Sequence, residues 1–258
     1  MKIQTLAAAS SEAYAQSTIC DRATDTQVLI QNVRGAAVVA FRGTNDFRKV
    51  IGDLEVNLVP FSQQLKLGKW HEGVGRAVNG IMDALVSALK GFPTGAPIYL
   101  TGHSFGGGCA PAAAYLLSAA GFNVQGVVTF AGMRFCDRLF SWHYWKRTKF
   151  PTYRVVAEYD VVPHLPIPAL FFLYRHVGQE IYISTGLDGL SNEEVQIGAG
   201  KTQSFLSIFD EFFWGSIDDV VREDGKLGGF ELEMHSIARY CQLVNKTSFM
   251  FETIHLNL

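Results

Sequence analysis

The chain has 258 residues and a formal net charge of −2, with 48% hydrophobic and 18% charged residues. This composition excludes an intrinsically disordered chain, and the charge gives no general attraction to phosphate backbones or anionic lipid surfaces, so nucleic acid is not an expected partner. The length is near the upper end of what one hydrophobic core serves, and because composition does not shift along the chain we expect a single domain over residues 1–258.

The first part of the chain is predicted to form a helix, a hairpin and a second helix. Residues 3–17 are rich in alanine and carry apolar side chains at helical spacing. Residues 26–33 and 36–41 are apolar or β-branched runs, and the two-residue link between them is typical of an antiparallel hairpin. An amphipathic helix is expected over residues 74–89.

Further along the chain, strands and helices alternate. An apolar strand over residues 98–101 precedes a helix of small residues over 106–120, and a strand over 124–130 follows. Two more buried strands are expected over 153–157 and 181–184, the latter near the sheet edge. Because strands separated by helices pair in parallel, we predict an α/β fold with a mostly parallel central sheet flanked by helices.

Ser104 lies in the segment Gly102-His103-Ser104-Phe105-Gly106, which is a GxSxG motif. The motif directly follows the apolar strand and directly opens the small-residue helix, and this is the strand, sharp turn and helix that a nucleophile elbow requires. The two glycines are explained because the strand and the helix pass so closely at the turn that a Cβ atom would collide. We therefore predict that Ser104 is a nucleophile.

A serine nucleophile needs a general base within hydrogen-bond reach and a carboxylate that holds the tautomer of that base. In α/β-hydrolases these partners follow the serine in the order acid, then histidine. Asp160 is the leading acid because it comes just after a buried strand, at the carboxyl end of the sheet where sites in α/β folds gather. Asp137, which follows the preceding strand, is the alternative.

Four histidines follow the acid and are candidates for the base: His164, His176, His235 and His255. His164 is only four residues from Asp160, His176 belongs to a run that leads into a strand, and His255 is close to the end of the chain. His235 stands directly before an amphipathic stretch over residues 237–244, a loop-to-helix position from which a side chain can reach over the sheet. These features favour His235 without excluding the other three.

The remaining sequence features mainly indicate which segments and sites are not expected. No apolar stretch approaches the roughly 20 residues that a transmembrane helix needs. A cleaved signal peptide is not expected, because polar residues interrupt the N-terminal apolar run at Ser10, so the compartment stays open between the cytoplasm and export by another route. The four cysteines are widely spaced, so we expect reduced thiols and no zinc site, with Cys109 buried on a helix. Residues 186–226 show no assignable pattern.

The chain resembles the class 3 lipases, a family of fungal triacylglycerol lipases with bacterial and plant relatives. Five segments carry the resemblance in chain order: residues 38–44 (VVAFRGT), 71–73 (HEG), 102–107 (GHSFGG), 159–166 (YDVVPHLP) and 174–180 (YRHVGQE). They resemble the oxyanion strand, a His-x-Gly element, the nucleophile elbow, the acid motif and the strand that follows it. The likeness covers nearly the whole chain and implies an α/β-hydrolase fold.

The resemblance also implies roles for individual residues. Ser104, Asp160 and His235 would form the catalytic triad, which decides among the histidines. The backbone N–H and hydroxyl of Thr44 and the backbone N–H of Phe105 would form the oxyanion hole. His103 and His176 would have no role in the triad and would be structural. No cofactor and no metal ion would be required.

In this family a helical lid follows the oxyanion residue, and the matching stretch is residues 45–57. Its apolar residues have the spacing of a short amphipathic helix, which fits a lid over an acyl pocket as well as a helix packed on the core. The apolar loop over residues 166–173 allows the same two interpretations. The implied partners are a small lipid or ester substrate and a transient lipid interface at residues 45–57.

The implied function is that of a lipase or carboxylesterase, which hydrolyses carboxylic esters of acylglycerols through an acyl-enzyme intermediate. Phospholipase A1 or galactolipase activity is an alternative, because a triad constrains the reaction and not the head group. A catalytically inactive lipid-binding protein is the alternative from another class, which would have no reason to keep every triad and oxyanion residue.

Overall fold

A computed structural model of the protein describes residues 1–44, 57–62, 66–158, 160, 162–166, 174–184, 194–197 and 235–247. The helices are α1 (Ile3–Glu12), α3 (Glu72–Leu89), α4 (Phe105–Ala119), α5 (Arg138–Arg147) and α9 (Ile237–Lys246), with a 3-10 turn η1 (Val162–His164). The strands are β1 (Ile19–Asp21), β2 (Thr26–Val33), β3 (Ala36–Phe41), β4 (Leu58–Pro60), β5 (Lys69–His71), β6 (Ile98–His103), β7 (Val124–Phe130), β8 (Thr152–Ala157), β9 (Gln179–Ser184) and β10 (Glu194–Ile197). Among the described helices, none is both long enough and apolar enough to span a bilayer.

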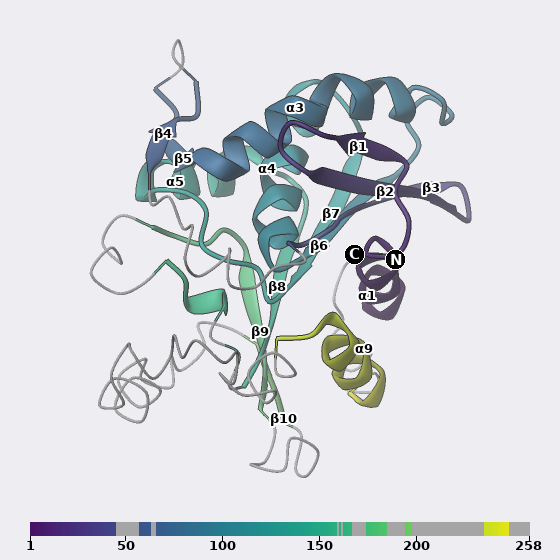
Figure 1. Ribbon diagram of the computed structural model, residues 1–258, viewed down its shortest axis with the longest axis vertical. Coiled ribbons are helices and arrows are strands. Elements are labelled where there is room, and N and C mark those ends of the chain that lie inside the picture. The colour runs from purple at the N-terminus through teal and green to yellow at the C-terminus, as the bar shows by residue number, and fades with distance from the viewer. Residues whose placement is uncertain are drawn as a thin grey trace.

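One sheet runs through the middle of the molecule, with its strands in the order β1-β2-β3-β6-β7-β8-β9-β10 (Figure 1). Strands β3, β6, β7, β8 and β9 pair in parallel, whereas both margins of the sheet are antiparallel. The predicted mostly parallel central sheet is confirmed. Since parallel strands point the same way, the residues that follow β6 and β8 meet at one edge of the sheet.

The β2–β3 hairpin has the bounds that the sequence predicts. Its two linking residues, Arg34 and Gly35, have φ values of 55° and 86°. Two consecutive positive φ values are the mark of a type I′ turn, whose twist matches that of the strands it joins. Val33 therefore pairs directly with Ala36, and β3 is delivered to the centre of the sheet, where every one of its residues is buried.

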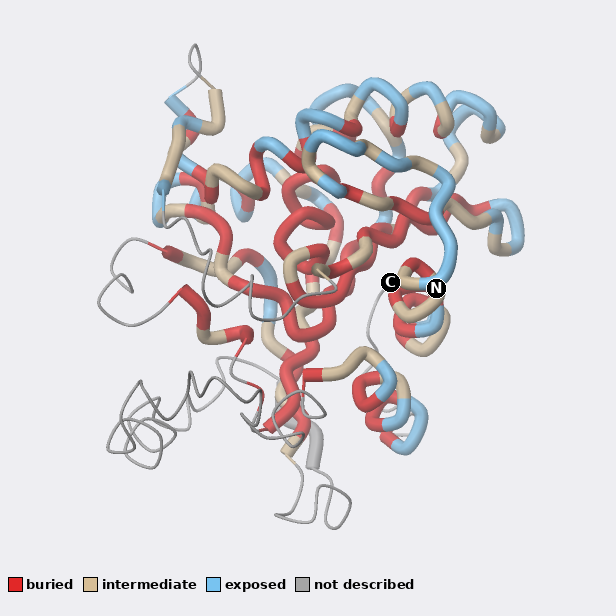
Figure 2. Tube along the Cα trace, in the orientation of Figure 1, coloured by how far each residue is buried: buried red, intermediate tan, exposed pale blue. Residues whose placement is uncertain are grey.

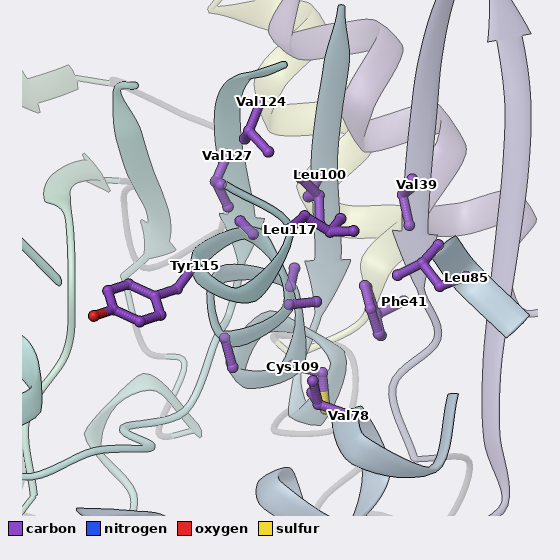
Figure 3. Packing of buried hydrophobic residues seen from close by; sticks show 14 of the residues in the cluster. Val39, Phe41, Val78, Leu85, Leu100, Cys109, Tyr115, Leu117, Val124 and Val127 are labelled. Carbon is purple, nitrogen blue, oxygen red and sulfur yellow. The ribbon is translucent and has the colours of Figure 1, made fainter. Parts of the chain in front are cut away.

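Helices cover both faces of the sheet. On one face α3, α4 and α5 share a core cluster, in which Leu117 of α4 lies by Leu100 of β6 and Cys109 of α4 lies by Val78 of α3 (Figure 3). On the other face α1 and α9 pack through residues such as Leu6 and Leu243. Figure 2 shows that burial is concentrated on the central strands and α4. The elements next to Ser104, Asp160 and His235 are therefore packed into these two clusters.

Two helix boundaries differ from the prediction for local reasons. The first helix ends at Glu12 instead of residue 17, because the chain then turns to the sheet and the Thr18 N–H donates to the Val28 carbonyl at 2.8 Å. Helix α3 begins two residues early, because Nδ1 of His71 accepts from the backbone N–H groups of its first turn, and histidine is not among the common capping residues.

Several elements have no counterpart in the prediction: β1, β4, β5, α5 and β10. Strands β1, β4 and β5 have three residues each, too few to show an alternating pattern. Strand β10 lies within residues 186–226, the stretch without an assignable pattern, and it adds an antiparallel margin to β9. The four cysteines are free, and Cys109 is buried on α4 as predicted.

Candidate active site

Ser104 occupies a sharp turn between β6 and α4. Its φ of 58° and ψ of −125° lie in a region that a residue with a side chain rarely adopts. The predicted reason for the glycines is confirmed: a Cβ atom on Gly102 would collide with the carbonyl group of Gly106, and one on Gly106 would collide with the backbone of Phe41. Gly107 is also constrained, since its Cβ would come 2.6 Å from Cα of Gly132.

Hydrogen bonds fix the backbone of Ser104, whereas its hydroxyl is not fixed in this way. The Ser104 N–H donates to the Phe130 carbonyl at 3.0 Å, and the Ser104 carbonyl accepts from the Gly107 N–H at 2.9 Å. The residue is buried, and within the described part of the chain its Oγ has no hydrogen-bond partner. A strained, rigid turn thus holds a hydroxyl that is not committed to a structural contact.

Asp160 lies between β8 and η1 and is fully buried, and each of its oxygens accepts hydrogen bonds. Oδ1 accepts from the Val162 N–H at 2.9 Å, and Oδ2 accepts from the Tyr240 hydroxyl at 2.7 Å. Nδ1 of His235 lies 3.1 Å from Oδ1 and 3.0 Å from Oδ2. Burial alone would raise the pKa of Asp160, but His235 and these donors outweigh it and lower the pKa. Asp160 is therefore an anion at neutral pH.

His235 stands just before α9, whose cap is the side chain of Ser236. Because a carboxylate only accepts hydrogen bonds, the short contact with Asp160 places the proton of a neutral His235 on Nδ1. Nε2 then carries the lone pair, which is the arrangement that a general base requires. The structure thus brings the predicted acid, Asp160, into contact with His235, the histidine favoured by its position. The two residues are 75 positions apart in the sequence.

His103 links this histidine to the elbow. Its ring lies 4.6 Å from the ring of His235, and its Nε2 lies 2.7 Å from the His235 carbonyl. Burial and the proximity of His235 lower the pKa of His103 to about 3, so the ring is neutral. Nε2–H must then donate to that carbonyl, and Nδ1 accepts from the Tyr14 hydroxyl at 2.8 Å. Tyr14, His103 and His235 form one hydrogen-bonded chain beside Ser104.

The other described candidate residues have different hydrogen-bond partners. Asp137 caps α5 by accepting from the Phe140 N–H at 2.7 Å. The His164 carbonyl accepts from Arg134, and Nε2 of His176 lies 2.7 Å from the Pro163 carbonyl. His255 lies outside the described residues.

Thr44 and Phe105, the predicted oxyanion residues, flank the turn. Phe105 opens α4, where the first backbone N–H groups have no partner within the helix. Thr44 follows Gly43, and a Cβ atom on Gly43 would lie 2.7 Å from the His103 carbonyl oxygen and 3.0 Å from Cβ of Ser104. The end of the β3 segment therefore runs against the elbow. The oxyanion hole itself stays a prediction.

The predicted lid mostly falls outside the described residues. Of residues 45–57 the structure describes Asn57, whose side-chain amide donates to Glu72 at 3.4 Å. Of the apolar loop over residues 166–173 it describes Pro166. The lid and the loop stay predictions.

Tyr240 is a functional neighbour that sequence reasoning missed, and its hydroxyl serves two buried groups. It donates to Asp160 and accepts from the Ala157 N–H at 3.0 Å.

Replacing Tyr240 with phenylalanine is expected to lower the free energy of unfolding by about 1–3 kcal/mol, because a buried donor and a buried acceptor both lose a partner. Urea denaturation measures this. Tyr99→Phe, on a half-buried side chain, is the control and should change stability by less than about 0.5 kcal/mol. Equal stability of Tyr240→Phe and the wild type would contradict the assignment.

Buried neutral histidines make stability depend on pH. Burial lowers the pKa of His71 and His164 to about 4 and that of His103 to about 3. Between these values and about pH 6.5 the unfolded chain binds protons that the folded chain does not, so the free energy of unfolding should fall as pH falls, by up to about 1.4 kcal/mol per pH unit for each histidine. Asp160, with its lowered pKa, does not act in this window. Calorimetry at pH 7, 6 and 5 checks the trend, and a constant or rising melting temperature toward pH 5 would contradict it.

Known proteins with similar sequences are fungal lipases. A lipase from Rhizopus niveus is 28% identical over 208 residues, which is 76% of this chain and 52% of that protein. A lipase from Rhizomucor miehei is 32% identical over 168 residues, which is 62% of this chain and 44% of that protein. This chain therefore spans about half the length of the curated relatives it matches.

Solved structures of lipases from the same two fungi share the fold. Lipase II from Rhizopus niveus superposes with a TM-score of 0.64 at 23% identity, covering 77% of this chain and 86% of that one. The Rhizomucor miehei triacylglyceride lipase superposes with a TM-score of 0.62 at 24% identity, covering 75% and 82%. Together with the parallel sheet and its flanking helices, these matches show an α/β-hydrolase fold, as predicted.

The family model described as lipase (class 3) matches residues 38–169, which is about half of the 258 residues. The matched segment contains most of β3, Thr44 shortly after that strand, the elbow with Ser104, and Asp160. His235 lies beyond it and is joined to it by the hydrogen bond to Asp160. The chain belongs to the class 3 lipase family.

Proposed function

We propose that this protein hydrolyses carboxylic esters with Ser104 as nucleophile, His235 as general base and Asp160 as the residue that orients the base. The observation that carries the proposal is the 3.0 Å contact between Nδ1 of His235 and Asp160, which gives His235 the tautomer that accepts a proton from serine. The strained turn at Ser104 and its uncommitted hydroxyl support the role of the nucleophile. Membership of the lipase (class 3) family supports the reaction type.

In the first half of the reaction, Ser104 Oγ attacks the ester carbonyl carbon while its proton moves to Nε2 of His235. The tetrahedral oxyanion accepts hydrogen bonds from the backbone N–H groups of Phe105 and Thr44, each worth about 3 kcal/mol. The anionic Asp160 stabilises the imidazolium that forms. The bond to the alcohol oxygen then breaks, the alcohol takes the proton from His235, and the acyl group remains on Ser104.

In the second half, water replaces the alcohol. His235 accepts a proton from water as the water oxygen attacks the acyl carbonyl, and the same N–H groups receive the oxyanion. The bond to Ser104 Oγ breaks, and His235 returns the proton to Oγ. A carboxylic acid leaves and the free enzyme is restored, so the cycle balances with water as the co-reactant and needs no cofactor.

The proposed substrates are acylglycerols with apolar acyl chains, and residues 45–57 are the proposed lid. The Rhizomucor miehei relative is by name a triacylglyceride lipase, which supports this class of substrate. A series of glycerol and p-nitrophenyl esters of increasing chain length tests it. We expect hydrolysis of glycerol esters with a rate jump above substrate solubility, because opening a lid at an interface exposes the site. Simple saturation below solubility would contradict the lid.

A panel of phospholipids and galactolipids separates the alternatives. Faster turnover of these lipids than of acylglycerols would replace the proposed substrate with a polar one and keep the triad. No turnover of any ester by folded protein would favour a lipid-binding protein instead and overturn the proposed reaction.

A further inference from the structure

Helix α5 presents a face of tryptophan and basic side chains to solvent. Trp142 is 52% exposed and Trp145 is 71% exposed, and Leu139 on the same face is 46% exposed. Arg138 and Lys146, four residues to either side of Trp142, are exposed beside it. Arg147 and Lys149 are exposed as well. We define the α5 surface as the following exposed residues: Arg138, Leu139, Trp142, Trp145, Lys146, Arg147 and Lys149.

The α5 surface is not needed to hold the helix in place. The opposite side of α5 is anchored by Phe140 and Tyr144, which are buried in the same core cluster as Tyr115 of α4. The Asp137 side chain caps the first turn. Lys146 and Arg147 stabilise the last turn of α5 through their interaction with the helix dipole. The exposed indoles of Trp142 and Trp145 have no comparable role in stabilising the helix.

The charge of this surface differs from that of the whole chain. Residues 138–149 contain Arg138, Lys146, Arg147 and Lys149 and no acidic residue, whereas the chain as a whole carries a net charge of −2. Nζ of Lys146 lies 4.8 Å from the ring centre of Trp145 and 6.0 Å from that of Trp142, so the cation and the indoles occupy one patch. Such a patch complements an anionic partner that also accepts aromatic rings.

A lipid–water interface with anionic head groups has this chemistry. Indole rings place their apolar body among acyl chains and their N–H among head groups, while lysine and arginine contact phosphate groups. A helix lying in the plane of the interface with these residues on its outer face is a recurrent mode of peripheral binding. α5 lies beside β5, toward one side of the molecule (Figure 1).

We propose that the α5 surface docks this protein on anionic lipid interfaces. The binding is separate from the chemistry at Ser104, since none of its residues belongs to the triad or the elbow. It differs also from the contact expected at residues 45–57. Docking through α5 raises the concentration of protein at an interface whether or not the protein hydrolyses the lipid.

Sedimentation with vesicles of ether-linked lipids tests this proposal. Dialkyl phosphatidylcholine, alone or mixed with dialkyl phosphatidylglycerol, contains no carboxylic ester, so the result does not depend on the proposed hydrolysis. We expect the full chain to bind the mixed vesicles at low salt and to be released as salt rises. Trp142→Ser with Trp145→Ser should weaken partition at least about tenfold. Lys146→Gln with Arg147→Gln should weaken it by about fivefold for each charge.

Arg22→Gln with Lys90→Gln is the matched control, because it removes two exposed charges outside α5 and should leave partition unchanged. Thermal melting and turnover of a soluble ester should be the same for all three double variants and the wild type. The proposal is overturned if the wild type does not bind mixed vesicles, if the α5 variants bind equally well, or if the control loses as much binding. A concentration-dependent dimer that the tryptophan variant abolishes, without vesicle binding, would assign the surface to a second copy and also overturn it.

Discussion

Replacing Ser104 with alanine is expected to lower kcat for p-nitrophenyl esters by roughly 10⁵–10⁶-fold, because no other group can form the acyl-enzyme. Folding should be preserved. The Ser104 hydroxyl has no hydrogen-bond partner in the described part of the chain, and the backbone bonds that hold the turn involve its N–H and carbonyl. Alanine meets the same positive φ as serine, so the strain in the turn is unchanged. Circular dichroism and the melting temperature provide the control.

Retained turnover in folded Ser104→Ala protein would exclude Ser104 as the nucleophile. The fold and the family would then stand, and the site would have to be sought around another side chain. A variant that loses both activity and its cooperative melt is resolved by Ser104→Cys, which keeps a nucleophilic atom of similar size at the same strained position. Turnover by folded Ser104→Cys protein that equals the wild-type rate would contradict the assignment equally, because replacing the nucleophilic oxygen with sulfur changes the chemistry of the acyl-enzyme.

Replacing Asp160 with asparagine is expected to lower kcat by about 10⁴-fold, with a smaller effect on KM. The asparagine amide would donate to Nδ1 of His235 and so move the histidine proton to Nε2, where it blocks acceptance of the Ser104 proton. Asparagine also accepts fewer hydrogen bonds than the carboxylate, so the Val162 N–H and the Tyr240 hydroxyl compete for one oxygen. A loss of stability of about 1–3 kcal/mol should accompany the loss of activity.

Asp137→Asn is the matched control for this substitution. Asp137 is the other acid at the carboxyl edge of the sheet, and in the structure it caps α5. Asparagine caps helices about as well as aspartate, so both kcat and stability should be close to those of the wild type. A large fall in kcat for Asp137→Asn, with normal activity in Asp160→Asn, would reverse the assignment of the acid.

The parts of the fold that could be predicted are those that neighbouring residues determine. The hairpin at Arg34 and Gly35 needs two residues with positive φ, and the elbow at Ser104 needs glycines next to it, so each leaves a local signature. Asp160 could be placed because the end of a buried strand is also recognisable locally. For His235 the local pattern gave a preference, and the family resemblance was needed to choose it.

The contacts that the sequence does not reveal join distant segments. The Tyr14 hydroxyl meets His103 across 89 residues, and the Tyr240 hydroxyl meets Asp160 across 80. Neither tyrosine differs locally from one that packs in a core. Tyr14 falls within the predicted first helix and Tyr240 within the amphipathic stretch after His235, and neither position identifies a partner.

Helix α5 was missed for a different reason. Aromatic side chains occupy both of its sides, with Phe140 and Tyr144 buried and Trp142 and Trp145 exposed. A helix that is apolar on both sides has no amphipathic period, so the pattern that located the other helices is missing here. The exposed tryptophans therefore prevented the prediction of α5 from the sequence, and they also distinguish its solvent-facing side in the structure.

Reaction of the folded protein with a fluorophosphonate, followed by peptide mass mapping, tests the role of Ser104 most directly. The reagent bonds covalently to a serine only where a base activates it and donors receive the developing negative charge. We predict one adduct, on the peptide that contains Ser104, with labelling lost in Ser104→Ala and strongly slowed in Asp160→Asn. An unlabelled folded protein, or an adduct on a different serine, would contradict the proposed site.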